Sequence, residues 1–103
     1  MILHLVSFRF REGVTDADVE RLTAALHDMA AGIPALLSYV AGPNLHLRPG
    51  GMDYAVAAIV ARPEDLDTYL DHPAHLAVYS AHLSDMITER AAAQLPLTDG
   101  TLR

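Results

Sequence analysis

Residues 2–10 divide into two sets of alternate positions, one of them largely apolar. One side of this segment carries four apolar residues and a histidine, namely Ile2, His4, Val6, Phe8 and Phe10. A repeat of two residues is typical of a β-strand, so the pattern predicts a strand over 2–10. The intervening positions begin with Leu3 and Leu5, so we expect this strand to be covered on both faces.

A helical repeat replaces the alternation after the strand. Thr15 and Asp18 have the spacing of a capping box, in which a threonine and an acidic residue three positions later close the first turn of a helix. The apolar positions that follow recur every three or four residues, at Val19, Leu22, Leu26, Met29 and Ile33. The pattern predicts an amphipathic helix that Gly32 and Pro34 bring to an end.

Shorter segments make up the rest of the chain. Strands are expected over Leu36–Ala41 and over the apolar run Tyr54–Ala61, with the Gly/Pro-rich loop GPNLHLRPGG between them. Pro63 and Pro73 suit the first turns of two further helices, the second of which we expect to reach about Glu89. Its predicted apolar stripe consists of Leu76, Tyr79, Leu83, Met86 and Ile87.

The C-terminal segment is ambiguous between helix and strand. Its three consecutive alanines favour a helix by intrinsic propensity, whereas the order of the preceding elements calls for a strand around Ala93–Thr98. Pro96 would either confine that strand to an edge of the sheet or leave one of its hydrogen bonds unmade.

The resulting order β, α, β, β, α, α, β predicts an α+β fold in one domain, 1–103. This order is that of a ferredoxin-like protomer, with a four-stranded antiparallel sheet and helices on one face. The other face would carry Leu3, Leu5 and Val40, which is too apolar to remain in water. We therefore expect a homodimer in which two sheets meet face to face.

Composition excludes several kinds of partner and site. The chain has no cysteine, which rules out disulfides and thiolate chemistry, and its net charge of −6 with no basic cluster disfavours nucleic acid. The longest apolar run is too short to span a bilayer, and the N-terminus lacks the pattern of a secretory signal. These features predict a cytoplasmic protein without a membrane segment.

Three of the six histidines lie in the stretch DHPAHLAVYSAH. His75 falls in the first turn of the predicted last helix, Tyr79 and His82 follow on the same side, and Tyr69 ends the preceding helix. An imidazole beside a phenol can act as an acid–base pair. The competing interpretation makes His72 a helix cap and His75 a surface or interface residue. A metal site is not expected, because no carboxylate converges on these imidazoles and the spacing suits no common ligand set.

Three segments, HLVSFRFREGVT, IPALLSYVAGPN and above all YLDHPAHLAVY, resemble the stress-responsive α/β-barrel (Dabb) family, whose members are dimeric barrels of ferredoxin-like protomers. The resemblance covers about residues 4–89. The best understood member is the plant olivetolic acid cyclase, which closes a linear polyketide by an aldol reaction without a cofactor. Its catalytic histidine corresponds to His75, its tyrosine to Tyr69 and a pocket histidine to His4. Two further pocket positions differ, since a histidine is Tyr54 here and a tyrosine is Leu26.

The resemblance implies a small enzyme without a cofactor that acts on a carbonyl or polyketide-like substrate, as an aldol-type cyclase or a related lyase or isomerase. His75 and Tyr69 are the predicted catalytic residues, and the predicted substrate-binding residues are His4, Leu26, Tyr54 and Tyr79. Two alternatives stay open. One is a non-catalytic dimer that binds a small apolar ligand or serves in a stress response, and the weaker one is a cofactor-free monooxygenase.

Overall fold

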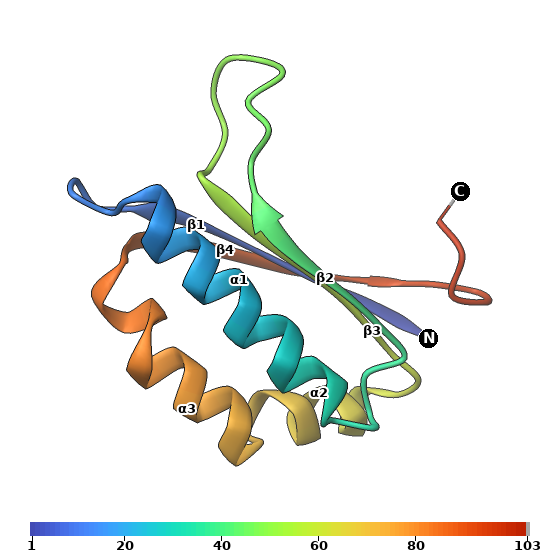
Figure 1. The fold of residues 1–103 in the computed structure, drawn as a ribbon. Helices are drawn as coiled ribbons and strands as arrows, with labels where there is room; N and C mark the ends of the chain where they lie inside the picture. Colours follow the sequence, from blue (N-terminus) through green and yellow to red (C-terminus); the bar gives the residue numbers. More distant parts are fainter. Residues whose placement is uncertain (103) are drawn as a thin grey trace.

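A four-stranded antiparallel sheet with all three α-helices on one face forms the framework of the protein (Figure 1). The computed structural model describes residues 1–102. Its strands lie in the order β2-β3-β1-β4. Along the chain the elements are β1 (Ile2–Phe10), α1 (Asp16–Ala31), β2 (Ser38–Pro43), β3 (Tyr54–Val60), α2 (Pro63–Leu70), α3 (Pro73–Ala81), η1 (Leu83–Asp85) and β4 (Ile87–Pro96). The predicted ferredoxin-like α+β fold is confirmed.

The first helix begins and ends as its sequence predicts. Thr15 Oγ1 accepts a hydrogen bond from the Asp18 amide at 3.2 Å, and the Asp18 carboxylate accepts one from the Thr15 amide at 3.0 Å. At the other end the Gly32 amide donates to the Met29 carbonyl at 3.0 Å. The apolar side of α1 is buried against the sheet through Leu22, Leu26 and Met29.

Strand pairing places the two faces of the sheet in very different surroundings. The helix-covered face contributes Phe8, Tyr54, Val56 and Ala58 to the core, and each of these is at most 4% exposed. On the opposite face of the protomer Val40 is 60% exposed and Leu95 is 48% exposed. Leu3 on this face is only 7% exposed, but around Val40 and Leu95 the face is apolar and bare in the isolated protomer, as the alternating pattern predicts.

The predicted end of the last helix is wrong. Helix α3 stops at Ala81, where His82 leaves the helical conformation, and the chain turns through η1 before β4 begins at Ile87. Antiparallel pairing of β4 along all of β1 outweighs the helix propensity of the alanines. The predicted apolar stripe breaks up accordingly, because its members lie partly on α3, partly in η1 and partly in β4.

Two further boundaries shift while their elements remain. The second strand runs two residues later than predicted, over Ser38–Pro43, and the fourth begins well before Ala93. Pro96 lies at the end of β4, which pairs only with β1 and is an edge strand, as expected. Among residues 1–102 there is no helix with the length and apolar character needed to cross a membrane.

Candidate functional site

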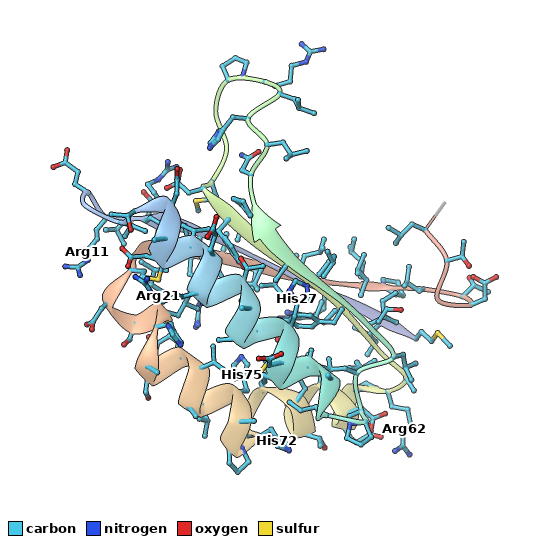
Figure 2. The ribbon with its side chains drawn as sticks, in the orientation of Figure 1. Arg11, Arg21, His27, Arg62, His72 and His75 are labelled. Carbon is cyan, nitrogen blue, oxygen red and sulfur yellow. The ribbon has the colours of Figure 1, made fainter. Side chains whose placement is uncertain are left out.

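The junction between α2 and α3 fixes the orientation of two histidines. His72 caps α3, since its Nδ1 accepts a hydrogen bond from the Ala74 amide at 3.1 Å, and Figure 2 shows it at the beginning of that helix. Nδ1 of His75 lies 2.9 Å from the Leu70 carbonyl oxygen. A carbonyl can only accept, so Nδ1 of His75 carries the hydrogen and Nε2 of the neutral ring has the free lone pair. His72 is thus structural, whereas His75 is held in the form of a base.

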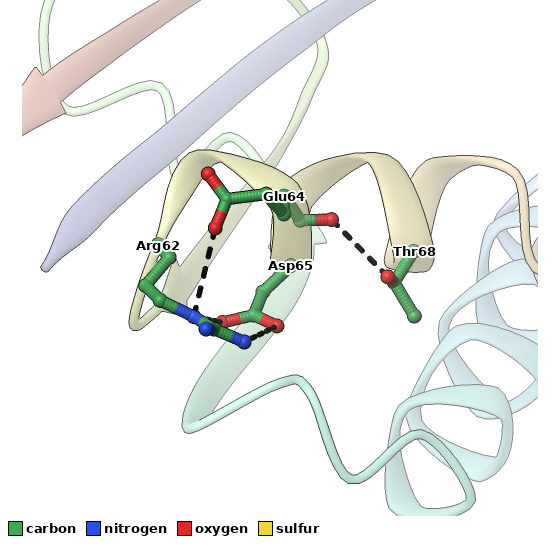
Figure 3. A network of polar contacts seen from close by, with 4 residues as sticks. All are labelled: Arg62, Glu64, Asp65 and Thr68. Atoms are coloured by element: carbon green, nitrogen blue, oxygen red, sulfur yellow. Dashed lines mark hydrogen bonds and ion pairs between the residues drawn. The ribbon is translucent and has the colours of Figure 1, made fainter.

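Helix α2 carries Tyr69, whose phenol is the neighbour of His75. Its first turn is closed at the surface by Arg62, whose guanidinium contacts the carboxylates of Asp65 at 3.3 Å and Glu64 at 3.7 Å, and Thr68 Oγ1 donates to the Glu64 carbonyl at 3.1 Å (Figure 3). These contacts are exposed and contribute little to stability. They help to hold a two-turn helix whose last turn places Tyr69, 2% exposed, against the sheet.

Tyr69 packs between two imidazoles. Its ring lies 4.9 Å from that of His75, measured between centroids, with the planes at 69°. The ring of His4, which comes from β1, lies 6.4 Å away on an edge-to-face approach of 75°. The structure therefore brings together the two predicted catalytic residues and the predicted strand histidine.

A single row across the sheet forms the floor beneath Tyr69. Strand pairing aligns four residues on the helix-covered face, in the order Tyr39, Ala58, His4 and Gln94. Ala58 is fully buried, and its small side chain leaves space above the centre of the row. The Tyr69 ring contacts the larger residues on both sides of Ala58, with Tyr39 at 6.2 Å and 82°. One alanine thus permits an aromatic cluster to form over the sheet.

His4 is held in the opposite tautomer from His75. The side-chain amide nitrogen of Gln94 lies 3.0 Å from His4 Nδ1. An amide nitrogen only donates, so Nδ1 of His4 accepts and its Nε2 carries the hydrogen. His4 can consequently offer a hydrogen-bond donor where His75 offers an acceptor.

Burial keeps both imidazoles neutral. It is the main reason that the pKa of His75 lies below its ordinary value of 6.5; Arg90 lowers it further, while the bond to Leu70 and the charge of Asp71 raise it in part. The pKa of His4 is also lowered, first by burial and then by the charges of His75 and Arg90. Near neutral pH the cluster contains two uncharged imidazoles.

The Tyr69 phenol stays protonated beside them. Burial raises the pKa of Tyr69, and the neighbouring Tyr39 offsets only part of the rise. A neutral base therefore lies next to a phenol that retains its hydrogen. This combination can remove a proton from carbon while donating a hydrogen bond to an oxygen that gains charge.

The other predicted binding residues lie in different surroundings. Tyr54 is fully buried, and its hydroxyl lies 2.7 Å from Thr23 Oγ1, which itself donates to the Val19 carbonyl. The Tyr54 hydrogen is therefore committed to Thr23, and the phenol ties β3 to α1. Leu26 belongs to the same core, while Tyr79 is 38% exposed on α3.

Sequence reasoning missed three members of the site. Tyr39 and Gln94 join it through the strand register, and Arg90 acts through its charge. The only signal for Tyr39 was its position two residues before Ala41 on an alternating strand.

Two surface grooves lie outside this cluster. Two grooves of about 570 and 600 Å³ flank the turn from Arg11 to Val14, and neither is lined by His75 or Tyr69. Within residues 1–102 no three histidine or acidic side chains are grouped so as to hold a metal ion. His75 itself is partly exposed, whereas Tyr69 is 2% exposed and His4 is 5% exposed.

Comparison with known proteins agrees with this architecture. The family model for the stress-responsive A/B barrel domain (Dabb) matches residues 2–96. An uncharacterised protein of Streptomyces coelicolor is 35% identical over 80 residues, which are 75% of this chain and 81% of that protein.

Two solved structures illustrate the range of similar folds. A dimeric ferredoxin-like protein of unknown function from Thermobifida fusca is 36% identical, with a TM-score of 0.86 over 93% of this chain and 90% of the other. The hydroxynitrile lyase of Passiflora edulis shares the fold at 12% identity, with a TM-score of 0.79 over 98% and 96% of the two chains. From the match of the family model and the curated relative, this chain belongs to the stress-responsive α/β-barrel (Dabb) family.

Proposed function

We propose that the protein is a cofactor-independent acid–base enzyme that acts on a carbonyl compound, such as a polyketide-like substrate, in an aldol-type cyclisation or a related lyase or isomerase reaction. The observation that carries the proposal is the bond from His75 Nδ1 to the Leu70 carbonyl, which reserves the lone pair of Nε2 in a ring packed against Tyr69. A base, a phenolic donor and a second imidazole are thereby combined in one buried cluster.

An aldol-type cyclisation and an isomerisation would share their first step. Nε2 of His75 takes a proton from the carbon next to a carbonyl, and Tyr69 donates a hydrogen bond to the enolate oxygen. In a cyclisation the enolate carbon then attacks a second carbonyl of the same molecule, and the imidazolium returns its proton to the new alkoxide. The Nε2 hydrogen of His4 would orient the substrate or a water molecule.

The fold is compatible with enzymatic activity. The Passiflora edulis protein with this fold is a hydroxynitrile lyase. The proposal for this chain nevertheless depends on its own residues, because that likeness concerns the fold alone.

Removing the base tests the proposal directly. Polyketide-like ketones are incubated with the protein in D₂O, and exchange of their α hydrogens is followed by NMR, so that proton removal is detected even without cyclisation. We expect His75→Gln and Tyr69→Phe each to lower the exchange rate by about 10²–10⁴-fold. His46→Gln, in the exposed β2–β3 loop, is the matched control and should exchange at the wild-type rate. Undiminished exchange in His75→Gln would contradict the proposal.

Two grooves away from the cluster favour one alternative, a non-catalytic protein that binds a small ligand. The two grooves near the Arg11–Val14 turn lie apart from His75 and Tyr69, so a ligand held there would not need either residue. This alternative predicts that ligand affinity, measured by calorimetry, survives the double substitution of His75 and Tyr69.

We further propose that two protomers associate through the bare faces of their sheets. The Thermobifida fusca relative is dimeric, and the face of this protomer has an apolar hollow of about 370 Å³ lined chiefly by alanines of β3 and β4 together with Leu5. A second copy would remove this surface from water.

A further inference from the structure

The hydroxyl of Tyr39 is the unusual polar group of the cluster. It is buried and has no hydrogen-bond partner among residues 1–102. Buried polar groups in native proteins are nearly always paired, because an unpaired one loses its bonds to water without replacement. Tyr54, one strand away, shows the usual solution, since its hydroxyl is paired with Thr23. The unpaired hydroxyl of Tyr39 therefore calls for a functional explanation.

The surroundings of Tyr39 indicate which group it can pair with. Its ring meets that of His27 at 5.9 Å and that of Tyr69 at 6.2 Å, both nearly perpendicular. Nδ1 of His27 donates to the Thr23 carbonyl oxygen at 3.0 Å, so Nε2 of this ring can accept a hydrogen bond but cannot donate one onward. Tyr69 has a hydroxyl that can both accept and donate.

The two phenols already influence each other. Burial raises the pKa of Tyr39, and the Tyr69 phenol raises it further, while Tyr39 pulls the pKa of Tyr69 in the opposite direction. The hydroxyls are thus close enough to interact, although Tyr39 lacks the geometry of a hydrogen bond in the resting structure. A small shift of either ring would give the two oxygens that geometry, and rotation about the C–O bond then directs the phenolic hydrogen.

We propose that Tyr39 is a positioning residue that acts through Tyr69: its hydroxyl donates to Tyr69 Oη when Tyr69 donates its own hydrogen to the substrate oxygen. The inference rests on the proposed function, in which Tyr69 is that donor. Hydrogen bonds in such a chain polarise one another, so the relay makes Tyr69 a stronger donor as negative charge develops. It favours substrates whose oxygen becomes an enolate or alkoxide, because the benefit grows with that charge.

The matched pair Tyr39→Phe and Tyr54→Phe separates this role from a structural one. Both substitutions remove one buried hydroxyl and keep the ring. Tyr39→Phe removes an unpaired hydroxyl, so the melting temperature should stay the same or rise, whereas Tyr54→Phe leaves Thr23 without its partner and should lower it.

The decisive readout is the titration of Tyr69 itself. The protein is labelled with 3-fluorotyrosine, which brings phenol titration to milder pH, and ¹⁹F resonances are assigned from the Tyr→Phe variants. In Tyr39→Phe the Tyr69 resonance should titrate at higher pH, because the hydroxyl that stabilises its charged form is gone. The other ionisable groups of the cluster are His4 on β1, Tyr54 on β3 and His75 on α3, and the charges of Arg90 on β4 and Asp71 after α2 act on His75. The histidines, with lowered pKa values, stay neutral throughout.

Turnover distinguishes failure of the relay from failure of the proposed function. On a substrate found by α-hydrogen exchange, Tyr39→Phe should lower kcat by about tenfold with KM little changed, less than the loss of a direct oxyanion donor. An unchanged Tyr69 titration in Tyr39→Phe would overturn the relay even if Tyr69→Phe is inactive. If Tyr69→Phe retains full turnover, the proposed function fails and Tyr39 has no catalytic role to support.

Discussion

Two neighbouring rows of the sheet are offset by one residue along each strand and therefore lie on opposite faces. They differ in polarity and in exposure. The row under the helices consists of Tyr39, Ala58, His4 and Gln94, and the row on the bare face consists of Val40, Ala57, Leu5 and Ala93. The first contains a phenol, an imidazole and an amide, whereas the second is entirely apolar and has no ionisable group. Burial of the first row alters the pKa values of His4 and Tyr39, while Val40 and Ala93 of the second row are exposed in the protomer. The pleat of the sheet therefore places the ionisable side chains and the exposed apolar side chains on opposite faces.

The largest effect is expected when a charge is placed in the bare row. Val40 is 60% exposed in the protomer, so Val40→Glu should leave the protomer folded. In a face-to-face dimer the same carboxylate would be buried without a partner, which costs about 3–5 kcal/mol and weakens association by more than about 100-fold. Analytical ultracentrifugation over a range of concentrations measures this change.

Ala24→Glu provides the control for added charge, since Ala24 is exposed on α1 at the other side of the molecule. It should sediment as the wild type does. If Val40→Glu also leaves sedimentation unchanged, the bare row is not the surface through which protomers associate.

A smaller effect is expected from filling the gap in the covered row. Ala58 is fully buried beneath Tyr69, so Ala58→Leu forces extra atoms into packed space and should lower the free energy of unfolding by about 1–3 kcal/mol. The adjacent Ala57→Leu adds the same atoms on the bare face and should change the stability of the protomer much less. Urea denaturation of both variants, each in the Val40→Glu background to suppress association, makes the comparison. Equal losses would mean that Ala58 does not provide the space for Tyr69.

Local patterns suffice for the parts of the fold that local contacts determine. Thr15 and Asp18 predict the start of α1 because both halves of the capping box lie within one turn. The end of α3 could not be predicted in the same way. Residues 82–93 are compatible with a helix, and it is their pairing with β1, at the other end of the chain, that makes the later part a strand.

The candidate site also combines residues that local sequence predicts with residues that only strand pairing brings in. His75 and Tyr69 are close in sequence and could be paired by spacing and by the family resemblance. His4 lies on the largely apolar side of the predicted first strand, but its hydrogen-bond partner, Gln94, is 90 residues away. Tyr39 enters the site only because β2 and β1 pair with opposite edges of β3 in a register that a single sequence does not specify.

The smallest effect concerns the pH dependence of stability. The folded-state pKa values of His4 and His75 lie below 6.5, the value expected for the unfolded chain, so the unfolded state binds more protons as the pH falls below about 6.5. The free energy of unfolding should then decrease from pH 7.5 to 5.5 and change no further from this cause below the folded pKa values. Asp18, whose pKa is lowered from 3.8, acts outside this range.

Urea denaturation at several pH values tests this. The Val40→Glu background is used again to suppress association, and the bare row has no natural ionisable group that would add to the decline. His4→Gln combined with His75→Gln should flatten the decline, whereas His46→Gln in the exposed loop should preserve it. Because burial is the largest cause of both shifts, a decline that persists in the double variant would mean that the helices do not desolvate this row. The distinction between the covered and bare rows would then be one of shape and polarity alone, and His75 would have no special fitness as a neutral base.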